Sequence, residues 1–499
     1  MLKEKTRCFF LVGVIVLGLV GTIVRQLPWC LDWSDQAKQA FVSYEMVNSG
    51  NWWYQHSPDG ELATKPPFCG WVSAALYKLT GSWKAAWHFP SLFAGLLLLF
   101  WVGKAAAPFG KGAAELAVIA CLFSHFTQRL FFIVRTDMVL ALLVFAPVAM
   151  ILSHIRSKMR WTWKQKVVYA LFLTAGLLTK GPVSYAFFVP GLIVFSLLEH
   201  RRGRDGYGPG WVAHVFPVVL FCLWVVAGAV LQPEFYDQVV VKEFGSRFKG
   251  DGANVLELLA GFLYYPMHLV GRYFPWSLLL IGLFALPEVR RNAVRQPEIV
   301  WLVCAFLGGL ILMSAVPSKR PDRIYPIIPI MSVLIPALAS HASTSCKAIN
   351  FVKKRANVLL IVLLVVNVSY AFCKAAKGYS KNEGALVPFG RNARETADEH
   401  EFRLAILDHV AFDTGMVLYA NETRVLSVEE AGREWNLDRL DALIVRKSDL
   451  PGVTNLLSNA VVVCASANTR SSEEQHFLLA RATATSSKRG ISAQTSRDD

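Results

Sequence analysis

Two aspartates and a set of basic residues lie near the ends of apolar segments. A charged side chain is unexpected there unless it has a specific role. Asp35 begins a polar stretch after the first apolar segment, and Asp137 follows Arg135 in the sequence RTDM. Lysine and arginine donate charge-assisted hydrogen bonds to phosphate, so cations around two carboxylates suit a phosphate-bearing lipid at a membrane surface. Any one cation could equally be a snorkelling side chain or a carboxylate partner. The cations are Lys65, Arg129, Arg135, Lys180, Lys242, Arg247, Arg272, Lys319, Arg320 and Arg323.

The elements that must position these residues are apolar helices. Hydrophobic residues make up 54% of the 499 residues and charged residues 17%, with a mean hydropathy of +0.39. These values exceed what one water-soluble core needs, and they predict a mainly α, polytopic membrane protein. About eleven apolar runs approach the roughly 17 to 25 residues that cross a bilayer as a helix. The runs are 8–24, 89–102, 116–133, 138–155, 167–179, 183–198, 215–231, 273–286, 299–316, 324–339 and 358–373.

Basic clusters in alternate connections predict the orientation. Six clusters lie near residues 3–7, 104–111, 156–166, 201–204, 290–295 and 347–355. The positive-inside rule makes all of them cytoplasmic, which puts the N-terminus inside and the C-terminus outside. This distribution explains most of the net charge of +15, so no nucleic-acid partner is needed. The first run lacks a small-residue cleavage site and is expected to be a retained span.

Three regions are expected on the outer side. The first loop, 28–86, should carry two amphipathic helices lying on the membrane surface. One is capped by Ser34, with Ala37, Ala40, Phe41, Tyr44 and Val47 as its apolar stripe; the other starts at Lys65-Pro66-Pro67, with Phe68, Trp71, Val72, Ala75 and Leu76 as its apolar face. The aromatic residues 52–54 suit either an interfacial belt or sugar stacking. The second loop, 232–272, is again long and basic.

The third outer region follows the last span and changes composition. Five strand-like runs, RLAILDH, MVLYA, RVLSV, ALIVRK and AVVVCAS, alternate with helix-like stretches such as SVEEAGREW. This alternation predicts a small α/β domain over 376–482, after a transmembrane domain over 1–375. The residues 483–499 are rich in Ser, Thr, Arg and Asp and are expected to be disordered. The cysteines form no C-x-x-C pair, and Cys30 and Cys69 are expected to be packing thiols.

A series of short motifs resembles the GT-C glycosyltransferases. Their order and spacing are similar to those of the branch that contains the aminoarabinose-to-lipid-A transferase and relatives of the protein O-mannosyltransferases. The resemblance runs from residue 1 to about 450. The motifs are the first loop with Asp35, SGNWW, TKPP, RTDM, LLTKGP, SRF, GRYFPWSL and SKRPDRIYPIIP.

The resemblance implies an enzyme that moves a sugar from a polyprenyl-phosphate carrier to an acceptor on the outer membrane face. Asp35 would be the essential carboxylate, accepting the acceptor's proton or orienting an acceptor phosphate during inverting displacement, and Asp137 would help shape the pocket. Lys65, Arg247, Lys180 and Arg320 would stabilise the leaving phosphate. Arg135, Tyr325 and Arg272 would line the substrate pocket. Asp35 and Lys180 could instead complement helix dipoles, and Tyr325 could be an interfacial tyrosine.

Two departures from the family pattern bear on metal binding. Relatives commonly have Asp-Glu where this chain has Asp35-Gln36, and Glu where it has Thr64. In those relatives the second Glu pairs with a histidine as metal ligands, and Lys242 occupies the corresponding later region here. A lysine can replace a cation's charge without its coordination geometry. We therefore expect no cofactor and metal-independent activity.

Several alternatives remain open at this level. The expected partners are a polyprenyl-phosphate-sugar donor, membrane lipids and a lipid acceptor such as lipid A or another glycolipid. A protein Ser or Thr acceptor is the runner-up. A secondary transporter or lipid flippase also has many spans with buried charges, but its carboxylates should lie at the bilayer midplane. The resemblance implies a bacterial inner membrane with a periplasmic C-terminal domain.

Overall fold

The computed structural model describes residues 2–31, 34–58, 60–203, 207–245, 255–342, 347–411, 414–467 and 475–482. The chain forms two compact units. Unit 1 comprises Met1–Leu27 and Thr64–Ala375, and unit 2 comprises Pro28–Ala63 and Ala376–Asp499. The predicted tail, 483–499, lies outside the described residues.

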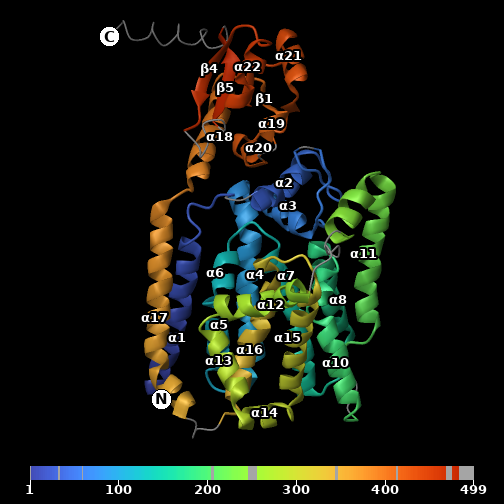
Figure 1. Cartoon of the computed structure of the whole chain (residues 1–499), viewed down its shortest axis with the longest axis vertical. Helices are drawn as coiled ribbons and strands as arrows, with labels where there is room; N and C mark the ends of the chain where they lie inside the picture. Colours follow the sequence, from blue (N-terminus) through green and yellow to red (C-terminus); the bar gives the residue numbers. More distant parts are fainter. Residues whose placement is uncertain are drawn as a thin grey trace. The chain divides into compact units, whose positions relative to one another are not determined.

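Unit 1 is helical (Figure 1). Within the described residues, seven helical segments, some of them joining two adjacent helices, are long and apolar enough to cross a membrane, and a bent pair with an angle of 110° gives an eighth candidate. Its helices are α1 (Leu2–Val24), α3 (Phe68–Thr80), α4 (Trp83–Ala106), η1 (Ala107–Phe109), α5 (Ala113–Leu122), α6 (His125–Leu130), α7 (Asp137–Ser157), α8 (Trp163–Lys180), α9 (Val183–Ala186), α10 (Val189–His200), α11 (Val212–Leu231), η2 (Tyr236–Phe244), α12 (Val255–Arg272), α13 (Trp276–Ala285), α14 (Pro287–Ala293), α15 (Pro297–Ala315), η4 (Pro321–Ile327), α16 (Ile328–Ala339) and α17 (Lys347–Lys377).

Three predicted spans are helical but are too short or too charged to count among these candidates. α1 and α5 are apolar over fewer residues, 9–24 and 113–122. α8 has the length but carries Lys164, Lys166 and Lys180. The predicted run 116–133 is broken, because the Ser124 hydroxyl accepts a hydrogen bond from the Thr127 amide and starts a separate helix, α6.

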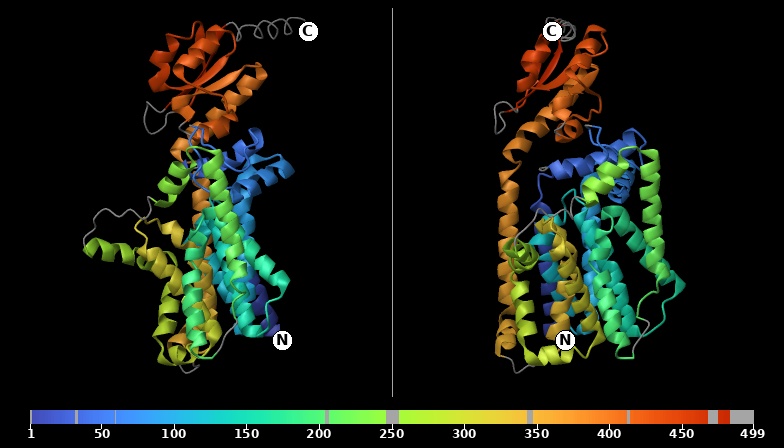
Figure 2. Two further views of the ribbon diagram at one scale, coloured as in Figure 1. Left: turned by 90° about the vertical axis from the view of Figure 1, so that its right-hand side faces the viewer. Right: turned by 45° about the vertical axis from the view of Figure 1, so that its right-hand side comes forward.

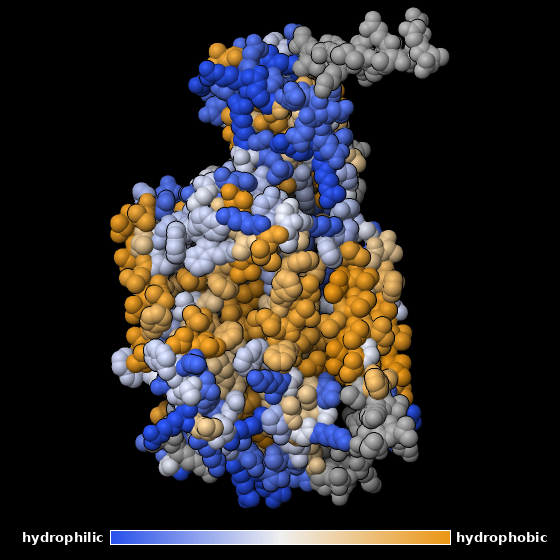
Figure 3. Space-filling view, turned by 180° about the vertical axis from the view of Figure 1, so that it is seen from behind, coloured by the Kyte–Doolittle hydropathy of each residue, from blue (hydrophilic) through white to orange (hydrophobic). Residues whose placement is uncertain are grey.

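Exposed apolar faces support a membrane setting. Only 11% of the most apolar part of α17 is buried, and for α11 the value is 22%. Phe216 and Leu223 on α11 and Val366 on α17 are more than half exposed, and Figure 3 shows hydrophobic residues gathered over one face of the bundle. α17 lies beside α1 (Figures 1 and 2), where Asn367 approaches Gly21. Such surfaces are stable in hydrocarbon but not in water, so the chain is a multi-pass membrane protein.

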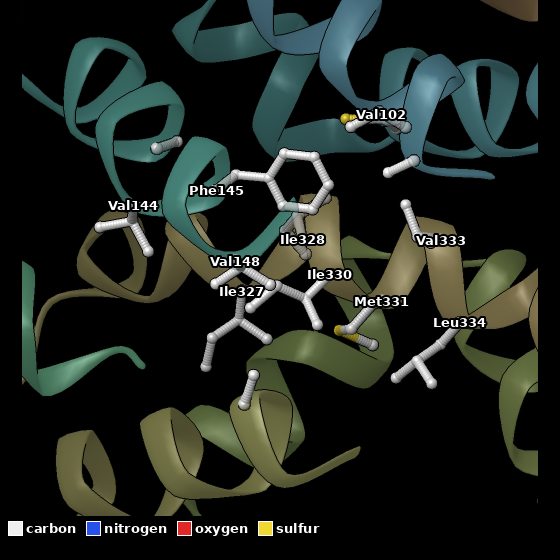
Figure 4. Close-up of a cluster of buried hydrophobic side chains, with 14 of the residues drawn as sticks. Val102, Val144, Phe145, Val148, Ile327, Ile328, Ile330, Met331, Val333 and Leu334 are labelled. Atoms are coloured by element: carbon white, nitrogen blue, oxygen red, sulfur yellow. The ribbon is translucent and has the colours of Figure 1, made fainter. Parts of the chain in front are cut away.

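The core of unit 1 is built on α7 and α16. Buried positions make up 94% of the most apolar part of α7 and 89% of that in the η4–α16 segment. Phe145 and Val148 of α7 lie close to Ile330 of α16 (Figure 4). α10 and α15 pack backbone to backbone, because a Cβ on Gly191 would stand 2.3 Å from the Cys304 carbonyl oxygen. This rigid core fixes the first residue of α7, which is Asp137.

Unit 2 holds a mixed five-stranded sheet of order β2-β1-β3-β5-β4, parallel from β2 to β3 and antiparallel from β3 to β4. The sequence MVLYA, predicted as a strand, is helical in α20, and β5 was not predicted. The elements are α2 (Ser34–Asn48), α18 (Lys381–Glu399), β1 (Leu404–Leu407), α19 (Asp408–Ala411), α20 (Thr414–Ala420), β2 (Val425–Leu426), α21 (Val428–Asn436), β3 (Ala442–Arg446), η5 (Lys447–Asp449), α22 (Leu450–Thr454), β4 (Ala460–Ala465) and β5 (His476–Arg481).

The two expected first-loop helices are present, and each differs from the prediction in its surroundings. Apart from Val47, the stripe of α2 is buried, and α2 packs against α20, after which the Tyr44 hydroxyl donates a 2.9 Å hydrogen bond to Asn421. α3 instead buries its small residues, including Cys69 and Ser73, and leaves Trp71 and Val72 half-buried. α3 packs against both α4 and α8, and Cys69 lies beside Thr179 of α8. Neither Cys69 nor Cys30 forms a disulfide.

The expected second outer loop, 232–272, contains more regular structure than predicted. Tyr236–Phe244 forms a helical segment of π type, and Val255–Arg272 forms α12. α12 meets α13 in the bent pair, with the Phe274–Pro275 peptide at the break. The sequence predicted a long basic loop here and not the helix over Val255–Arg272.

Candidate active site

A buried carboxylate, Asp137, opens α7 and binds two cations. One of its oxygens lies 2.6 Å from the Lys180 Nζ, and the other lies 3.0 Å from the Arg135 Nε. The Asp137 side chain is 2% exposed, with Lys180 and Arg135 at about a tenth. Lys65 is also close enough to interact electrostatically with Asp137. The structure therefore brings together four of the residues predicted from sequence.

Helix ends explain this placement. Asp137 lies in the first turn of α7, where a negative charge complements the helix dipole, and Lys180 ends α8, where a positive charge does the same. Gly181 follows Lys180 with φ of 63°, a backbone conformation that ends α8 and that glycine adopts without strain. Lys180 can therefore complement the dipole of α8 and form an ion pair with Asp137 at the same time.

A second carboxylate, Asp322, was not singled out by the sequence analysis. It lies in η4, and Arg135 bridges it to Asp137 through a 2.9 Å contact of its Nη1. Arg272 and Arg129 approach the other Asp322 oxygen at 3.4 and 3.7 Å. The only sequence signal was an acid set between Arg320 and Arg323 in SKRPDRIYP, some 187 residues from Arg135.

The remaining cations of SKRPDRIYP hold the turn before α16. The Lys319 Nζ donates to the carbonyls of Met313 and Ser314, and Arg323 donates to the Ser318 carbonyl and hydroxyl. The Arg320 amide lies 3.4 Å from the Tyr265 hydroxyl. Burial lowers the pKa of Lys319. Lys319 and Arg323 are therefore engaged in shaping the backbone that presents Asp322.

Tyr325 is buried beneath the charged residues. Its side chain is fully buried, and its hydroxyl lies 3.2 Å from the Thr127 hydroxyl and 3.3 Å from the Met138 sulfur. It thus ties η4 to α6 and to the start of α7. Sequence analysis assigned Tyr325 to the pocket, and in this structure its hydroxyl is used for packing.

The structure describes some of the other residues singled out from the sequence. Asp35 is half-buried on α2 in unit 2. Arg247 lies outside the described residues. Cys69 packs near Lys65 and Lys180, and burial raises the pKa of its thiol to about 12, which disfavours the thiolate. Within the described ranges, no three His, Cys, Asp or Glu side chains are grouped as a metal site.

Two linked carboxylates with several surrounding cations suit the binding of a charged oxyanion. Arginine and lysine in a site of low dielectric stabilise negative charge more strongly than they do in water. Burial, together with Arg272 and Arg135, lowers the pKa of Arg129, while Asp322 opposes that shift. Arg129 is thus close to other cations, an arrangement that a bound phosphate would stabilise.

Comparisons with known proteins agree on one family of folds. Residues 64–228 match the family described as dolichyl-phosphate-mannose-protein mannosyltransferase. The chain is 28% identical over 346 residues to the undecaprenyl phosphate-alpha-4-amino-4-deoxy-L-arabinose arabinosyl transferase of Serratia proteamaculans, covering 67% of this chain and 60% of that relative. The enzyme of the same name from Yersinia pestis is 26% identical over 395 residues, covering 76% and 69%. The chain therefore spans under two thirds of the length of the Serratia relative.

Solved structures give the same result for the fold. The crystal structure of ArnT from Cupriavidus metallidurans bound to undecaprenyl phosphate superposes with a TM-score of 0.64 at 18% identity, covering 95% of this chain and 98% of that one. An archaeal oligosaccharyltransferase, AglB from Archaeoglobus fulgidus, gives 0.50 at 10% identity, covering 89% and 70%. The predicted resemblance to the GT-C glycosyltransferases is confirmed.

Proposed function

We propose that this chain, a GT-C-fold relative of the arabinosyl transferases, moves a sugar from a polyprenyl-phosphate donor to lipid A or another cell-envelope glycolipid. The observation that carries the proposal is the network of Lys180, Asp137, Arg135 and Asp322 at the ends of apolar helices. The donor would be of the undecaprenyl type, as in the names of the arabinosyl transferase relatives.

In the proposed inverting displacement, one residue accepts the proton and others stabilise the leaving group. The acceptor oxygen attacks the anomeric carbon and loses its proton to Asp35, while the bond from that carbon to the donor phosphate breaks. The departing polyprenyl phosphate takes the electron pair, and Lys65, Lys180, Arg320 and Arg247 stabilise its charge. Asp35 is assigned this role because of its position in the first-loop motif.

Asp137 would position the phosphate-binding cations and shape the pocket. Its two oxygens fix the Lys180 Nζ and the Arg135 guanidinium, so neither side chain needs to reorganise when charge develops on the leaving group. Arg135, Arg272 and Tyr325 remain the proposed pocket residues.

We further propose the membrane arrangement predicted from sequence. Counted with the eight candidates, α1, α5 and α8 give eleven spans. The basic clusters then put the N-terminus in the cytoplasm and the C-terminal α/β domain in the periplasm of a bacterial inner membrane. The domain limits remain 1–375, 376–482 and 483–499, with outer loops at 28–86 and 232–272.

Two competing functions are less well supported. A transporter should hold its carboxylates near the bilayer midplane, whereas Asp137 is the first residue of α7 and Lys180 and Arg272 are the last residues of α8 and α12. A protein Ser or Thr acceptor is favoured by the mannosyltransferase family match over 64–228. The nature of the acceptor therefore needs a direct assay.

Transfer of radiolabelled sugar by the purified protein tests the proposal. Donors would be a set of undecaprenyl-phosphate-linked sugars, and acceptors would be crude membrane lipids and envelope proteins offered separately. We expect label in the lipid fraction with wild type and none with Asp35→Asn. Label in the protein fraction alone would favour the mannosyltransferase-like alternative, and equal transfer by Asp35→Asn would remove Asp35 from the mechanism.

A further inference from the structure

A short non-helical stretch, residues 131–136, joins α6 to α7 and carries Arg135. The stretch lies inside unit 1, where Phe131, Phe132 and Val134 are at most 3% exposed. A buried backbone carbonyl outside a helix or strand needs a hydrogen-bond donor from another part of the chain. The elements packed around this stretch must therefore supply donors to it.

One face of α4 supplies such donors. The His88 Nδ1 lies 2.7 Å from the Phe132 carbonyl oxygen, and because a carbonyl only accepts, this ring nitrogen carries a proton. The Ser91 hydroxyl donates to the Ile133 carbonyl at 2.7 Å and lies 3.4 Å from the Arg135 carbonyl. The His88 ring also stacks on the Phe132 ring, with 5.2 Å between the centroids. Two residues one turn apart on α4 thus bind two consecutive carbonyls of the stretch.

A third position on the same face of α4 gives the stretch room. Gly95 follows Ser91 by one turn, and a Cβ on Gly95 would stand 2.7 Å from the Phe131 ring. Spacings of three and four residues put His88, Ser91 and Gly95 on one side of the helix. His88 and Ser91 are 3% and 2% exposed, within a candidate membrane span. Polar side chains inside a span are unfavourable unless they have partners, and they commonly mark functional positions.

The stretch held by α4 presents Arg135 to two carboxylates. The Arg135 Nε lies 3.0 Å from Asp137, and its Nη1 lies 2.9 Å from Asp322. The Arg135 amide donates to the Ile133 carbonyl at 2.9 Å, and this same carbonyl accepts from Ser91. A shift of this backbone would therefore move the guanidinium relative to both carboxylates.

We infer that His88 and Ser91 are positioning residues for sugar transfer, which hold residues 132–135 so that Arg135 keeps bridging the two carboxylates. This inference rests on the proposed function, in which Arg135 belongs to the substrate pocket. His88 and Ser91 act through the backbone of the stretch, so Arg135 needs no reorganisation as charge develops on the leaving phosphate. A misplacement of about 1 Å can lower a rate about a hundredfold, so loss of either hydrogen bond should reduce kcat.

Steady-state kinetics tests the inference. His88→Phe keeps a ring that can stack on Phe132 but loses the donor, whereas His88→Asn keeps an N–H donor at the position of Nδ1. We expect kcat to fall at least about tenfold in His88→Phe and in Ser91→Ala, with both KM values within about twofold of wild type. His88→Asn should recover most of the kcat. Equal losses in His88→Phe and His88→Asn would assign the effect to packing and overturn the inference, as would a rise in donor KM with kcat unchanged.

Thr22→Val is the matched control. Thr22 is fully buried in α1, and its hydroxyl donates at 2.8 Å to the Gly18 carbonyl of the same helix. The variant removes a buried hydroxyl-to-carbonyl hydrogen bond that does not reach residues 131–136, so kcat should stay at the wild-type value. A fall in kcat equal to that of Ser91→Ala would show a general effect of losing a buried hydrogen bond, and it would also overturn the inference.

Amide hydrogen exchange without substrates separates this inference from the proposed function. Full-length wild type and variants in detergent would be compared over peptides that cover 131–136 and, as a reference, α16. We expect faster exchange across 131–136 in His88→Phe and Ser91→Ala, with the exchange of α16 unchanged. Wild-type exchange across 131–136 in both variants would overturn the inference even if kcat fell. Should wild type transfer no sugar, the proposed function fails, and the exchange data still decide whether α4 holds the stretch that carries Arg135.

Discussion

Asp137 and Asp322 share Arg135, yet the structure holds the two carboxylates in different ways. The contacts of Asp137 are 2.6 and 3.0 Å long, and both partners are about nine-tenths buried. Asp322 makes one short contact, to Arg135, and two longer ones to arginines that keep about a quarter of their exposure. The difference indicates that the pairs of Asp137 are held more rigidly than those of Asp322.

Removing Asp137, the more rigidly held carboxylate, should have the largest effect. Asp137→Asn would leave Lys180 buried without its counter-ion, at a cost of about 3–5 kcal/mol in the free energy of unfolding. We expect a lower thermal unfolding midpoint in detergent and loss of sugar transfer. Asp35→Asn is the control, because it should abolish transfer and leave the midpoint in place. An Asp137→Asn protein with an unchanged midpoint would contradict the assignment of a rigidly held pair.

Removing Asp322, the less rigidly held carboxylate, should cost less. In Asp322→Asn, Arg129 and Arg272 keep partial access to solvent, so we expect a loss of roughly 1–2 kcal/mol in the free energy of unfolding. Thermal unfolding of both variants under one set of conditions gives the comparison directly. A larger loss for Asp322→Asn than for Asp137→Asn would reverse the distinction between the two sites.

A third carboxylate, in unit 2, extends the comparison to an exposed pair. The hydrogen bond from Arg403, whose side chain is 51% exposed, lowers the pKa of Asp441 below 3.8. A lowered pKa of the folded state means that the pair stabilises the protein above pH 3.8 and loses this contribution as pH falls below that value.

Asp441→Asn should therefore lower stability by less than about 1 kcal/mol at neutral pH, because exposed pairs contribute little. Amide hydrogen exchange of β3 in the full-length protein, compared between wild type and variant across pH, would measure this. The difference should disappear as the pH falls below 3.8, and a difference that grows at acid pH would contradict the sign.

The smallest expected effect is that of metal removal. Thr64 stands where the resemblance to the GT-C glycosyltransferases predicts a metal-binding Glu, so we expect exhaustive chelation to leave the rate of sugar transfer unchanged. Complete loss of transfer that a divalent ion restores would show that the cations at Asp137 and Asp322 do not suffice for the leaving phosphate.

The apolar runs predicted the helical frame of unit 1 well, because a membrane span must be long and apolar whatever its neighbours are. Each of the eleven runs contains a helix, although the run 116–133 is interrupted at Ser124 and the run 183–198 is divided between α9 and α10. The strand predicted at MVLYA failed for a different reason. A short apolar run suits a buried helix as well as a strand, and only packing in unit 2 decides between them.

The site was predictable where motifs carried charge at helix ends. Asp137, Lys180 and Arg135 were named from RTDM and LLTKGP, and the structure brings them into contact. Asp322 was missed, because its partners come from α6, α12 and the bend before α7, and its neighbours in sequence are cations with local roles. A sequence motif shows which charges are present, and only the fold shows which of them meet.

The most direct test of the central claim is the stoichiometry of the reaction. Purified wild-type protein would be given an undecaprenyl-phosphate-linked sugar and a phosphorylated lipid acceptor, and mass spectrometry would quantify free undecaprenyl phosphate and glycosylated acceptor over time. The account predicts that the two products appear in equal amounts and that neither forms with Asp35→Asn. Movement of the intact donor across a bilayer with neither product formed would contradict it and identify a lipid transporter.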